Sequence, residues 1–434
     1  MGNPLLKNLL LTALGSAMGL CAQTYVVDAQ GGGNFLDLPQ AVATVPSGAV
    51  LHVRPGAYSA FSLANKSLSI LGDDPNSVLV DMGLTSLVIG PTTATDRVLI
   101  QNLHLKTLVF GSGILVIRDA AGQTLLDRVS FDIAPTAVFG SDQRIQVERS
   151  ANVHLFQCVF GPTTSQGNGF GKIDVVDSWI ELRACTAIGN PCSSNTFVAA
   201  NPGLWLHHSI AFSVGCNFTG GVGGPAGGCG LPSPGPSNGG PGVRVDGGSA
   251  LHSVRDTVNG GVGGSGIACR PGGAQGGNGI QVDASSFRGI GSGITAGAGG
   301  YTGGLPGTQI VATGGAIVDF PLMPSLVANL KGVPVPGMPI TLSLSARAGD
   351  TAILMLAYDQ VFLPVPPLVT TGALLVAPAV VLGPFTIATG GVLDVPLALP
   401  LTWPRDQWIP FQFLAAPPSL QEVWASNSVG ILAR

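Results

Sequence analysis

The chain has 434 residues, of which 64 are Gly and 33 are Pro, with 45% hydrophobic and 10% charged residues. This much Gly and Pro excludes a helical protein, and the high hydrophobic share excludes a disordered one. The formal net charge of −4, without a basic run, argues against a nucleic-acid partner, so an ordered and mostly β protein remains.

Residues 1–22 have the pattern of a secretory signal peptide, with one lysine ahead of the apolar run Leu9–Leu20. The alternatives are a buried N-terminal helix, or a lipoprotein that would use Cys21 as acceptor. A later apolar stretch, 373–388, contains two prolines and fits strands better than a membrane span. We therefore expect a secreted or cell-surface protein with no membrane span after signal removal.

The next segment carries a family resemblance. Residues 25–58 read YVVDAQGGGNFLDLPQAVATVPSGAVLHVRPGAY, and residues 66–79 read KSLSILGDDPNSVL. They resemble the opening of right-handed parallel β-helix proteins of the pectin lyase-like superfold, and within it the start of pectin methylesterases. The resemblance implies a short helix over the open end of the tube at Asp37–Val45, then a strand and a Pro-Gly-x-Tyr turn.

The catalytic motifs of pectin methylesterases do not match. Ala60 stands where that family has a Glu, and Thr136–Gly140 lacks the Asp of the family's catalytic segment. The later Gly-Arg-Pro-Trp segment is absent. The resemblance therefore implies a fold and no catalytic residue.

A short sequence pattern recurs between about residues 50 and 310, at steps of about 30 residues. Two apolar residues are followed by one polar residue, then by alternating apolar and polar residues, and then by Gly or Pro. A repeat of this length is typical of a solenoid. One aligned column holds Leu103, Val129, Cys158, Cys185, Cys216 and Asp256. The column two residues further on holds Leu105, Phe131, Phe160, Ala187, Phe218 and Val258. Stacked coils would place this second column in a ladder inside the tube. A stripe that binds an aromatic ligand is the alternative.

Six cysteines remain after signal removal: Cys158, Cys185, Cys192, Cys216, Cys229 and Cys269. An even number in an exported protein predicts disulfides. The repeat favours the pairs Cys158–Cys185, Cys192–Cys216 and Cys229–Cys269. The alternative joins Cys185 to Cys216 and Cys158 to Cys192, and buried free thiols are a further possibility.

Glycine blocks follow several of these phrases. The sequence GGVGG occurs at 220–224 and again at 260–264, and we expect tight corners and protruding loops between coils there. The segments ending at Asp246 and Asp283 approach a repeat-type calcium motif, but each Asp comes two positions late. We therefore expect these two residues to make side-chain-to-backbone turns, and we predict no metal site or cofactor.

The best candidate cluster for chemistry comes from outward positions of three successive coils. Asp127, His154, Glu181 and Arg183 would share one wall, where they could bind a sugar or act as acid and base. An exposed, mutually paired charge patch is the simpler interpretation, and we assign no catalytic residue. His207 and His208 are expected to be a surface pair.

Near residue 315 the glycine blocks give way to apolar runs bounded by proline. The runs lie at 340–346, 351–358, 392–399, 409–415 and 429–433. Several short strands with turns between them predict a β-sandwich. Trp403, Trp408 and Trp424 would mostly pack in its core, although tryptophans can also stack on sugars.

The sequence thus predicts an all-β chain: a signal peptide (1–22), a right-handed parallel β-helix with Gly-rich loops (23–314) and a C-terminal β-sandwich (315–434). We expect an exported, non-catalytic scaffold or glycan-binding adhesion protein, with a polysaccharide or cell-surface component as partner. The alternative is a carbohydrate-active enzyme of the pectin lyase-like superfold, a polysaccharide lyase or an esterase. Only the lyase alternative would use calcium.

Overall fold

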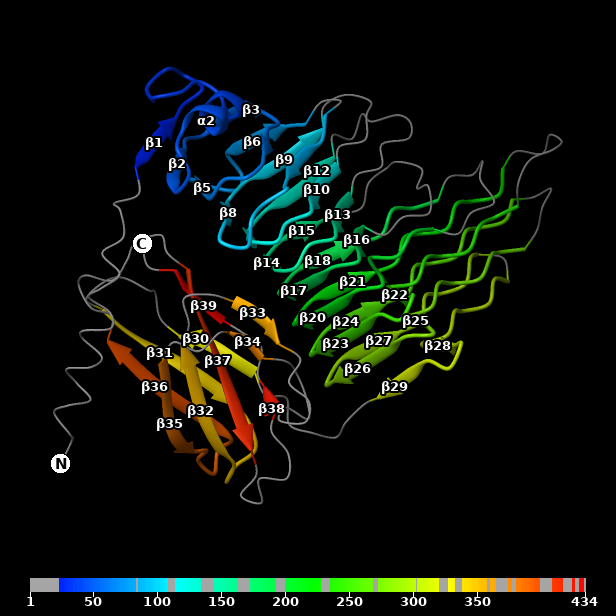
Figure 1. Cartoon of the computed structure of the whole chain (residues 1–434). Coiled ribbons are helices and arrows are strands. Elements are labelled where there is room, and N and C mark those ends of the chain that lie inside the picture. Colours follow the sequence, from blue (N-terminus) through cyan, green and yellow to red (C-terminus); the bar gives the residue numbers. More distant parts are fainter. Residues whose placement is uncertain are drawn as a thin grey trace.

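In the computed structural model, the chain winds into a tube whose faces are three long parallel sheets (Figure 1). The structure describes residues 23–82, 85–107, 114–133, 144–161, 172–192, 200–227, 235–267, 272–301, 303–319, 327–331, 338–356, 360–363, 374–376, 380–398, 408–416, 424–425 and 429–432. The expected signal peptide, Cys229 and Cys269 therefore lie outside the described residues.

Each complete coil of the tube contributes one strand to each of three sheets, and β1 (Thr24–Val27) and β29 (Ile317–Asp319) add one further strand at each end of sheet 1. Sheet 1 contains β1 (Thr24–Val27), β2 (Ala49–Val53), β5 (Leu68–Gly72), β8 (Arg97–Gln101), β11 (Gln123–Asp127), β14 (Val153–Phe156), β17 (Trp179–Arg183), β20 (Ile210–Val214), β23 (Ala250–Val254), β26 (Ser286–Ile290) and β29 (Ile317–Asp319). Sheet 2 contains β3 (Gly56–Ser59), β6 (Val78–Asp81), β9 (His104–Thr107), β12 (Ser130–Ile133), β15 (Val159–Phe160), β18 (Thr186–Ile188), β21 (Asn217–Thr219), β24 (Thr257–Asn259) and β27 (Gly293–Thr295). Sheet 3 contains β4 (Ser62–Leu63), β7 (Leu87–Ile89), β10 (Ile114–Arg118), β13 (Arg144–Glu148), β16 (Ile173–Val176), β19 (Leu204–His207), β22 (Val243–Asp246), β25 (Ile280–Asp283) and β28 (Ile310–Thr313).

The predicted fold class, a parallel β-helix followed by a β-sandwich, is confirmed. The predicted register is also confirmed, because Phe131 pairs with Leu105 and Phe160, and Phe218 pairs with Ala187 and Val258. The rings of Phe131 and Phe160 lie 5.8 Å apart inside the tube. The column is part of the continuous hydrophobic core, as expected for stacked coils that bury their apolar sides together.

The predicted disulfides of the cysteine column are wrong. Cys158, Cys185 and Cys216 do stack on successive coils, but all three are buried free thiols, which excludes both predicted pairing schemes for them and for Cys192. Their sulfurs contact backbone carbonyls instead, with Cys158 Sγ 3.3 Å from Phe156 O and Cys185 Sγ 3.2 Å from Leu155 O. Burial raises the pKa of the Cys158 and Cys216 thiols, so these two side chains stay neutral.

The corners between sheets 3 and 1 repeat one local pattern. A residue with positive φ, such as Arg149, Asp177 or His208, turns the chain, and a serine follows it. The serine hydroxyl accepts a hydrogen bond from a backbone N–H of the preceding coil. These serines form a ladder of Ser150, Ser178, Ser209, Ser249 and Ser285. The ladder satisfies buried backbone donors at corners where the sheets supply no partner.

The glycine blocks form extended segments that project from the tube between sheets 2 and 3, shown in green and yellow in Figure 1. Outgoing and returning segments bond through their backbones: Gly240 N to Gly221 O (2.9 Å), and Gly261 N to Gly240 O (2.8 Å). A Cβ atom on Gly261 would lie 1.9 Å from Gly221 O. Only glycine allows these backbones to approach so closely, so the blocks are packed and are not simple corners.

The N-terminal end of the tube is closed by α2 (Leu38–Thr44), which confirms the helix expected at Asp37–Val45. Asp37 caps it by accepting hydrogen bonds from the N–H of Leu38 and, across the end of the tube, from that of Ser59, both at 2.8 Å. The helix buries Leu38, Ala41 and Val42 against the core and so covers the first coil at this end.

The antiparallel strands of the C-terminal region form two main sheets around a separate core. One contains β30 (Val327–Lys331), β31 (Pro339–Ser345) and β36 (Val392–Ala398); the other contains β35 (Val380–Thr386), β32 (Thr351–Leu356), β37 (Trp408–Ala416), β38 (Trp424–Ala425) and β39 (Val429–Leu432). A hairpin of β33 (Gln360–Leu363) and β34 (Leu374–Val376) completes the region. Each of the five apolar runs named from the sequence overlaps a strand of these sheets.

Candidate functional site

The four residues named from the sequence all lie on the outer face of sheet 1. His154 alternates with the core residues Val153 and Leu155, so its side chain points away from the core, and His154 pairs in register with Glu181. Asp127 and Arg183 lie in the neighbouring column, separated by Phe156. The expected shared wall is therefore formed.

The group nevertheless does not form an accessible site. His154 Nδ1 lies 2.9 Å from Glu181 Oε2, and both side chains are fully buried. His154 Nε2 is 2.6 Å from Asn152 Oδ1, and the Trp179 ring meets the imidazole edge-on. The interpretation of an exposed charge patch is thus wrong for this pair, which is an internal contact.

Asp127 and Arg183 take part in other contacts. Asp127 forms an ion pair with Arg128 at 3.1 Å and accepts a hydrogen bond from Gln101. The Arg183 guanidinium lies over the Phe156 ring, 5.6 Å from its centroid, and burial lowers its pKa. The four candidates therefore take part in different contacts: His154 with Glu181, Asp127 with Arg128 and Gln101, and Arg183 with Phe156.

Around these polar residues, the outer face of sheet 1 is mostly buried and carries two apolar clusters. Its outward side chains include Val50, Leu71, Leu99, Leu125, Phe156, Phe212, Val214 and Val254. His252 belongs to the same column as Glu181, and burial lowers its pKa to about 4, which keeps it neutral. This face is built for packing and not for binding a polar ligand from solvent.

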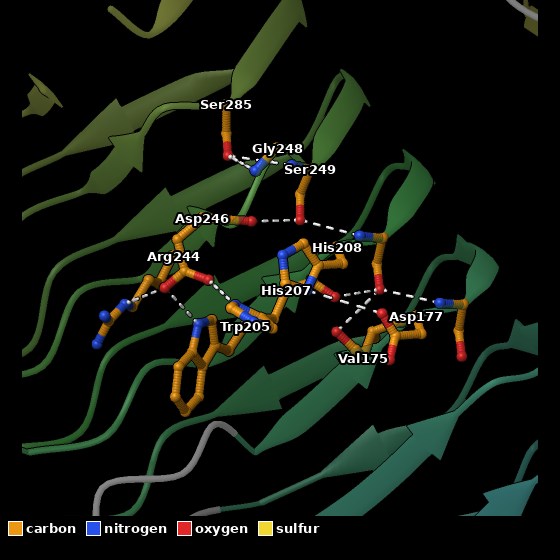
Figure 2. A network of polar contacts seen from close by, with 12 residues as sticks. Val175, Asp177, Trp205, His207, His208, Arg244, Asp246, Gly248, Ser249 and Ser285 are labelled. Carbon is orange, nitrogen blue, oxygen red and sulfur yellow. Dashed lines mark hydrogen bonds and ion pairs between the residues drawn. The ribbon is translucent and has the colours of Figure 1, made fainter. Parts of the chain in front are cut away.

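A second histidine–carboxylate group lies on the outer face of sheet 3, close to the corner with sheet 1 (Figure 2). His207 on β19 pairs in register with Asp246 on the next coil, and Trp205 pairs with Arg244. The sequence contained this arrangement as LWLH and VRVD in equivalent places on adjacent coils. The alignment of the two phrases is hard to see in the sequence, because the stretch between them contains a long glycine-rich segment.

Asp246 is the centre of this group. Its Oδ2 accepts hydrogen bonds from Trp205 Nε1 and from Arg244 Nε, both at 2.9 Å, and its Oδ1 lies 2.6 Å from His207 Nδ1. The Arg244 guanidinium is stacked over the Trp205 ring at 4.7 Å from its centroid. The expectation that Asp246 makes a side-chain-to-backbone turn is wrong, because its carboxylate binds three side chains.

The imidazoles of His207 and His208 lie 4.0 Å apart, centroid to centroid, so the expected pair exists. His208 Nδ1 faces Asp177 at 3.7 Å. Gly247 gives the pair its space, because a Cβ atom there would lie 2.9 Å from His207 Nδ1 and 3.1 Å from His208 Cδ2. The His207 side chain is 42% exposed and that of Arg244 is 41% exposed, whereas Asp246 is 11% exposed.

The same corner carries a further charge pair two coils away. Arg149 donates two hydrogen bonds to Asp119, at 2.8 and 3.1 Å. The guanidinium lowers the pKa of Asp119, and the carboxylate raises the pKa of Arg149. This pair shows that charges on the corner can be exposed and matched without converging on a histidine or an aromatic ring.

The geometry defines what the Trp205–Arg244–Asp246–His207 group can do. One buried carboxylate holds an aromatic ring, a guanidinium and an imidazole, while both cationic or titratable side chains remain open to solvent. Such a group can bind an acidic or hydroxyl-rich ligand by charge-assisted hydrogen bonds and ring contact. Within the described residues, no group of three or more His, Cys, Asp or Glu side chains is arranged to hold a metal ion.

Comparisons with known proteins add no family. No protein-family model matches the chain, and no curated protein matches it significantly. In the part of the chain that the structure describes, no helix is long and apolar enough to cross a membrane.

Proposed function

We propose that this protein is an exported, non-catalytic β-solenoid that binds a glycan with acidic groups on the outer face of sheet 3. The tube serves as a rigid support, and the Trp205–Arg244–Asp246–His207 group forms the binding surface. The observation that carries the proposal is the half-exposed Arg244 guanidinium, stacked on Trp205 and held by Asp246.

Three features support a carbohydrate as ligand. Aromatic side chains with a polar handle are suited to sugars, because a ring can pack on the C–H face while hydrogen bonds reach the hydroxyls. A guanidinium binds carboxylates with paired hydrogen bonds, which favours acidic sugars. Because Asp246 fixes both groups in advance, little side-chain entropy is lost on binding.

The test is affinity electrophoresis and calorimetry with polygalacturonate, alginate and neutral dextran as probes. We expect the two acidic polymers to bind, and Trp205→Ala and Arg244→Ala each to weaken binding at least tenfold. Arg149→Ala is the matched control, since it removes an exposed arginine from the same corner. Absence of binding, or equal loss in Arg149→Ala, would overturn the proposal.

A second candidate function is a polysaccharide lyase or esterase, which the family resemblance of residues 25–58 implies. The specific observation in its favour is the short contact of Asp246 with His207 Nδ1, because an imidazole oriented this way can act as a base through Nε2. The assay is release of unsaturated uronides or of methanol from pectin, with and without calcium.

Turnover lost in His207→Ala and retained in His208→Ala would favour the enzyme and its sheet 3 site. Turnover lost in Asp127→Asn, in a variant that still folds, would instead move the site to sheet 1. Absence of turnover together with binding of the acidic polymers favours the scaffold.

A further inference from the structure

The two ends of the tube differ in what covers the hydrophobic core. Each end leaves three apolar residues only partly buried against the core: Tyr25, Phe35 and Ala60 at the N-terminal end, and Ile294, Ala316 and Val318 at the last coil. At the N-terminal end α2 also covers the core, whereas no described helix covers it at the last coil. Large apolar side chains are exposed on this last coil: Ile317 is 67% and Leu305 71% exposed. Figure 1 shows β28 and β29 at this end of the tube.

Among the described residues, no strand pairs with the outer side of the last coil. Ile280 N donates to Gln309 O and Ala284 N donates to Thr313 O, so the odd-numbered residues of β28 face β25. In a parallel ladder the residues between them point their N–H and C=O groups to the opposite side. Ile310 and Ala312 therefore direct their backbone groups to the open edge, and β27 and β29 are likewise the outermost strands of their sheets.

This edge lacks the devices that normally prevent pairing between molecules. Natural edges carry charged side chains, prolines or bulges. β27 and β28 contain neither a charged residue nor a proline, and β29 has only Asp319, which forms an ion pair with Arg288 at 3.3 Å. An uncharged edge does not repel an identical edge.

We infer that the last coil is a dimerisation surface and that its partner is a second copy of this chain, joined tail to tail by a two-fold axis. Two identical edges facing one another run antiparallel, which permits regular pairing of their backbones. A two-fold contact uses the same surface on both partners and closes after two copies. A head-to-tail filament is blocked, because α2 and β1 occupy the opposite end.

Continuity of the core supports this partner. The half-buried Ile294 and Val318 of one copy would be covered by the last coil of the other, so a single core would run through both tubes. A partner of another sequence would have to offer the matching three-sided edge, which a second copy has by construction.

Sedimentation velocity on the full chain over a micromolar concentration series tests the inference. We expect a species of twice the chain mass. Ala312→Pro removes a donor on the open edge without touching the β25–β28 ladder, and Ile317→Lys adds a charge there. The pair of substitutions should raise the dimer Kd at least tenfold, with far-UV circular dichroism unchanged.

Val222→Lys is the matched control, since Val222 is 50% exposed on a glycine-rich segment away from the last coil. It should leave the dimer intact. A wild-type chain that stays monomeric throughout the series would overturn the inference, and this result does not depend on any variant folding. A dimer that survives both edge substitutions, or that only Val222→Lys dissociates, would overturn it as well.

Discussion

Two histidine–carboxylate pairs on adjacent faces of one tube have opposite environments. His154 and Glu181 on sheet 1 are fully buried, whereas His207 on sheet 3 is 42% exposed beside an Asp246 that is nearly covered. Residue types and spacing across the coils are alike, so neither pair is marked as functional by composition alone. Burial decides the role: the first pair can only stabilise the fold, and the second can meet a ligand.

The largest expected effect on stability comes from a substitution in the buried His154–Glu181 pair. Glu181→Ala leaves His154 without its carboxylate partner in a dry environment and should lower the free energy of unfolding by about 3–5 kcal/mol. Urea unfolding measures it. The double variant His154→Leu/Glu181→Met should recover most of the loss. A cost of Glu181→Ala below about 1 kcal/mol would contradict the structural role.

The carboxylate of Asp256 is buried inside the tube. Asp256 accepts hydrogen bonds from Ser253 Oγ (2.6 Å) and Cys216 N (2.7 Å), and burial raises its pKa to about 6 from the usual 3.8. The folded state therefore binds the Asp256 proton more tightly than the unfolded state does. Its contribution to stability is fully present below about pH 4 and is lost as the pH rises through 6.

The expected loss is about 3 kcal/mol between pH 4 and pH 7, from a pKa difference of about two units. Urea unfolding at pH 4 and at pH 7 should show this loss of stability, and the Asp256→Asn variant should not show it. Asp119→Asn, on the exposed corner, should leave it in place. An Asp256→Asn variant with the wild-type pH dependence would be inconsistent with the raised pKa.

Substitution of two adjacent glycines, Gly247 and Gly248, tests whether the position of His207 matters in the exposed pair. Gly247 and Gly248 both have positive φ, but only at Gly247 would a Cβ atom crowd His207; at Gly248 it meets nothing within 4 Å. Both alanine variants place a side chain at a positive φ, 65° at Gly247 and 79° at Gly248. Gly247→Ala should therefore cost about 1 kcal/mol more than Gly248→Ala. It should also weaken binding of polygalacturonate, while Gly248→Ala should not. Equal behaviour would mean that the position of His207 is irrelevant.

The smallest effect is expected at the Arg149–Asp119 pair. Both side chains are largely exposed, at 56% and 44%, and exposed ion pairs contribute little to stability. Arg149→Ala should leave the melting temperature unchanged in calorimetry. A clear drop would show that charges on this corner support the fold, and that the corner is less free for ligands than we propose.

The architecture was largely predictable from the sequence, because repeats report on neighbouring coils. The column of Leu105, Phe131, Phe160 and Phe218 aligned in the sequence and stacks in the structure. The helix at Asp37–Val45 came from a family resemblance and was confirmed at Leu38–Thr44. In each case the signal is local to one coil or to two adjacent coils.

The site was not predictable in the same way. Outward positions of Glu181 and Asp246 look equivalent along their strands, and the burial of one sheet face depends on the packing of the whole chain. The cysteine column shows a related limit: stacking of Cys158 on Cys185 was correct, but stacked inward side chains can remain thiols, because each sulfur finds a backbone carbonyl.

The most direct test is chemical modification of histidine by diethyl pyrocarbonate, read by mass spectrometry with and without polygalacturonate. Our account predicts that His207 reacts in the free protein and is protected by the polymer, while His154 stays unmodified in both samples. Modification of His154 in the folded protein, or a His207 that reacts equally with and without polymer, would contradict it.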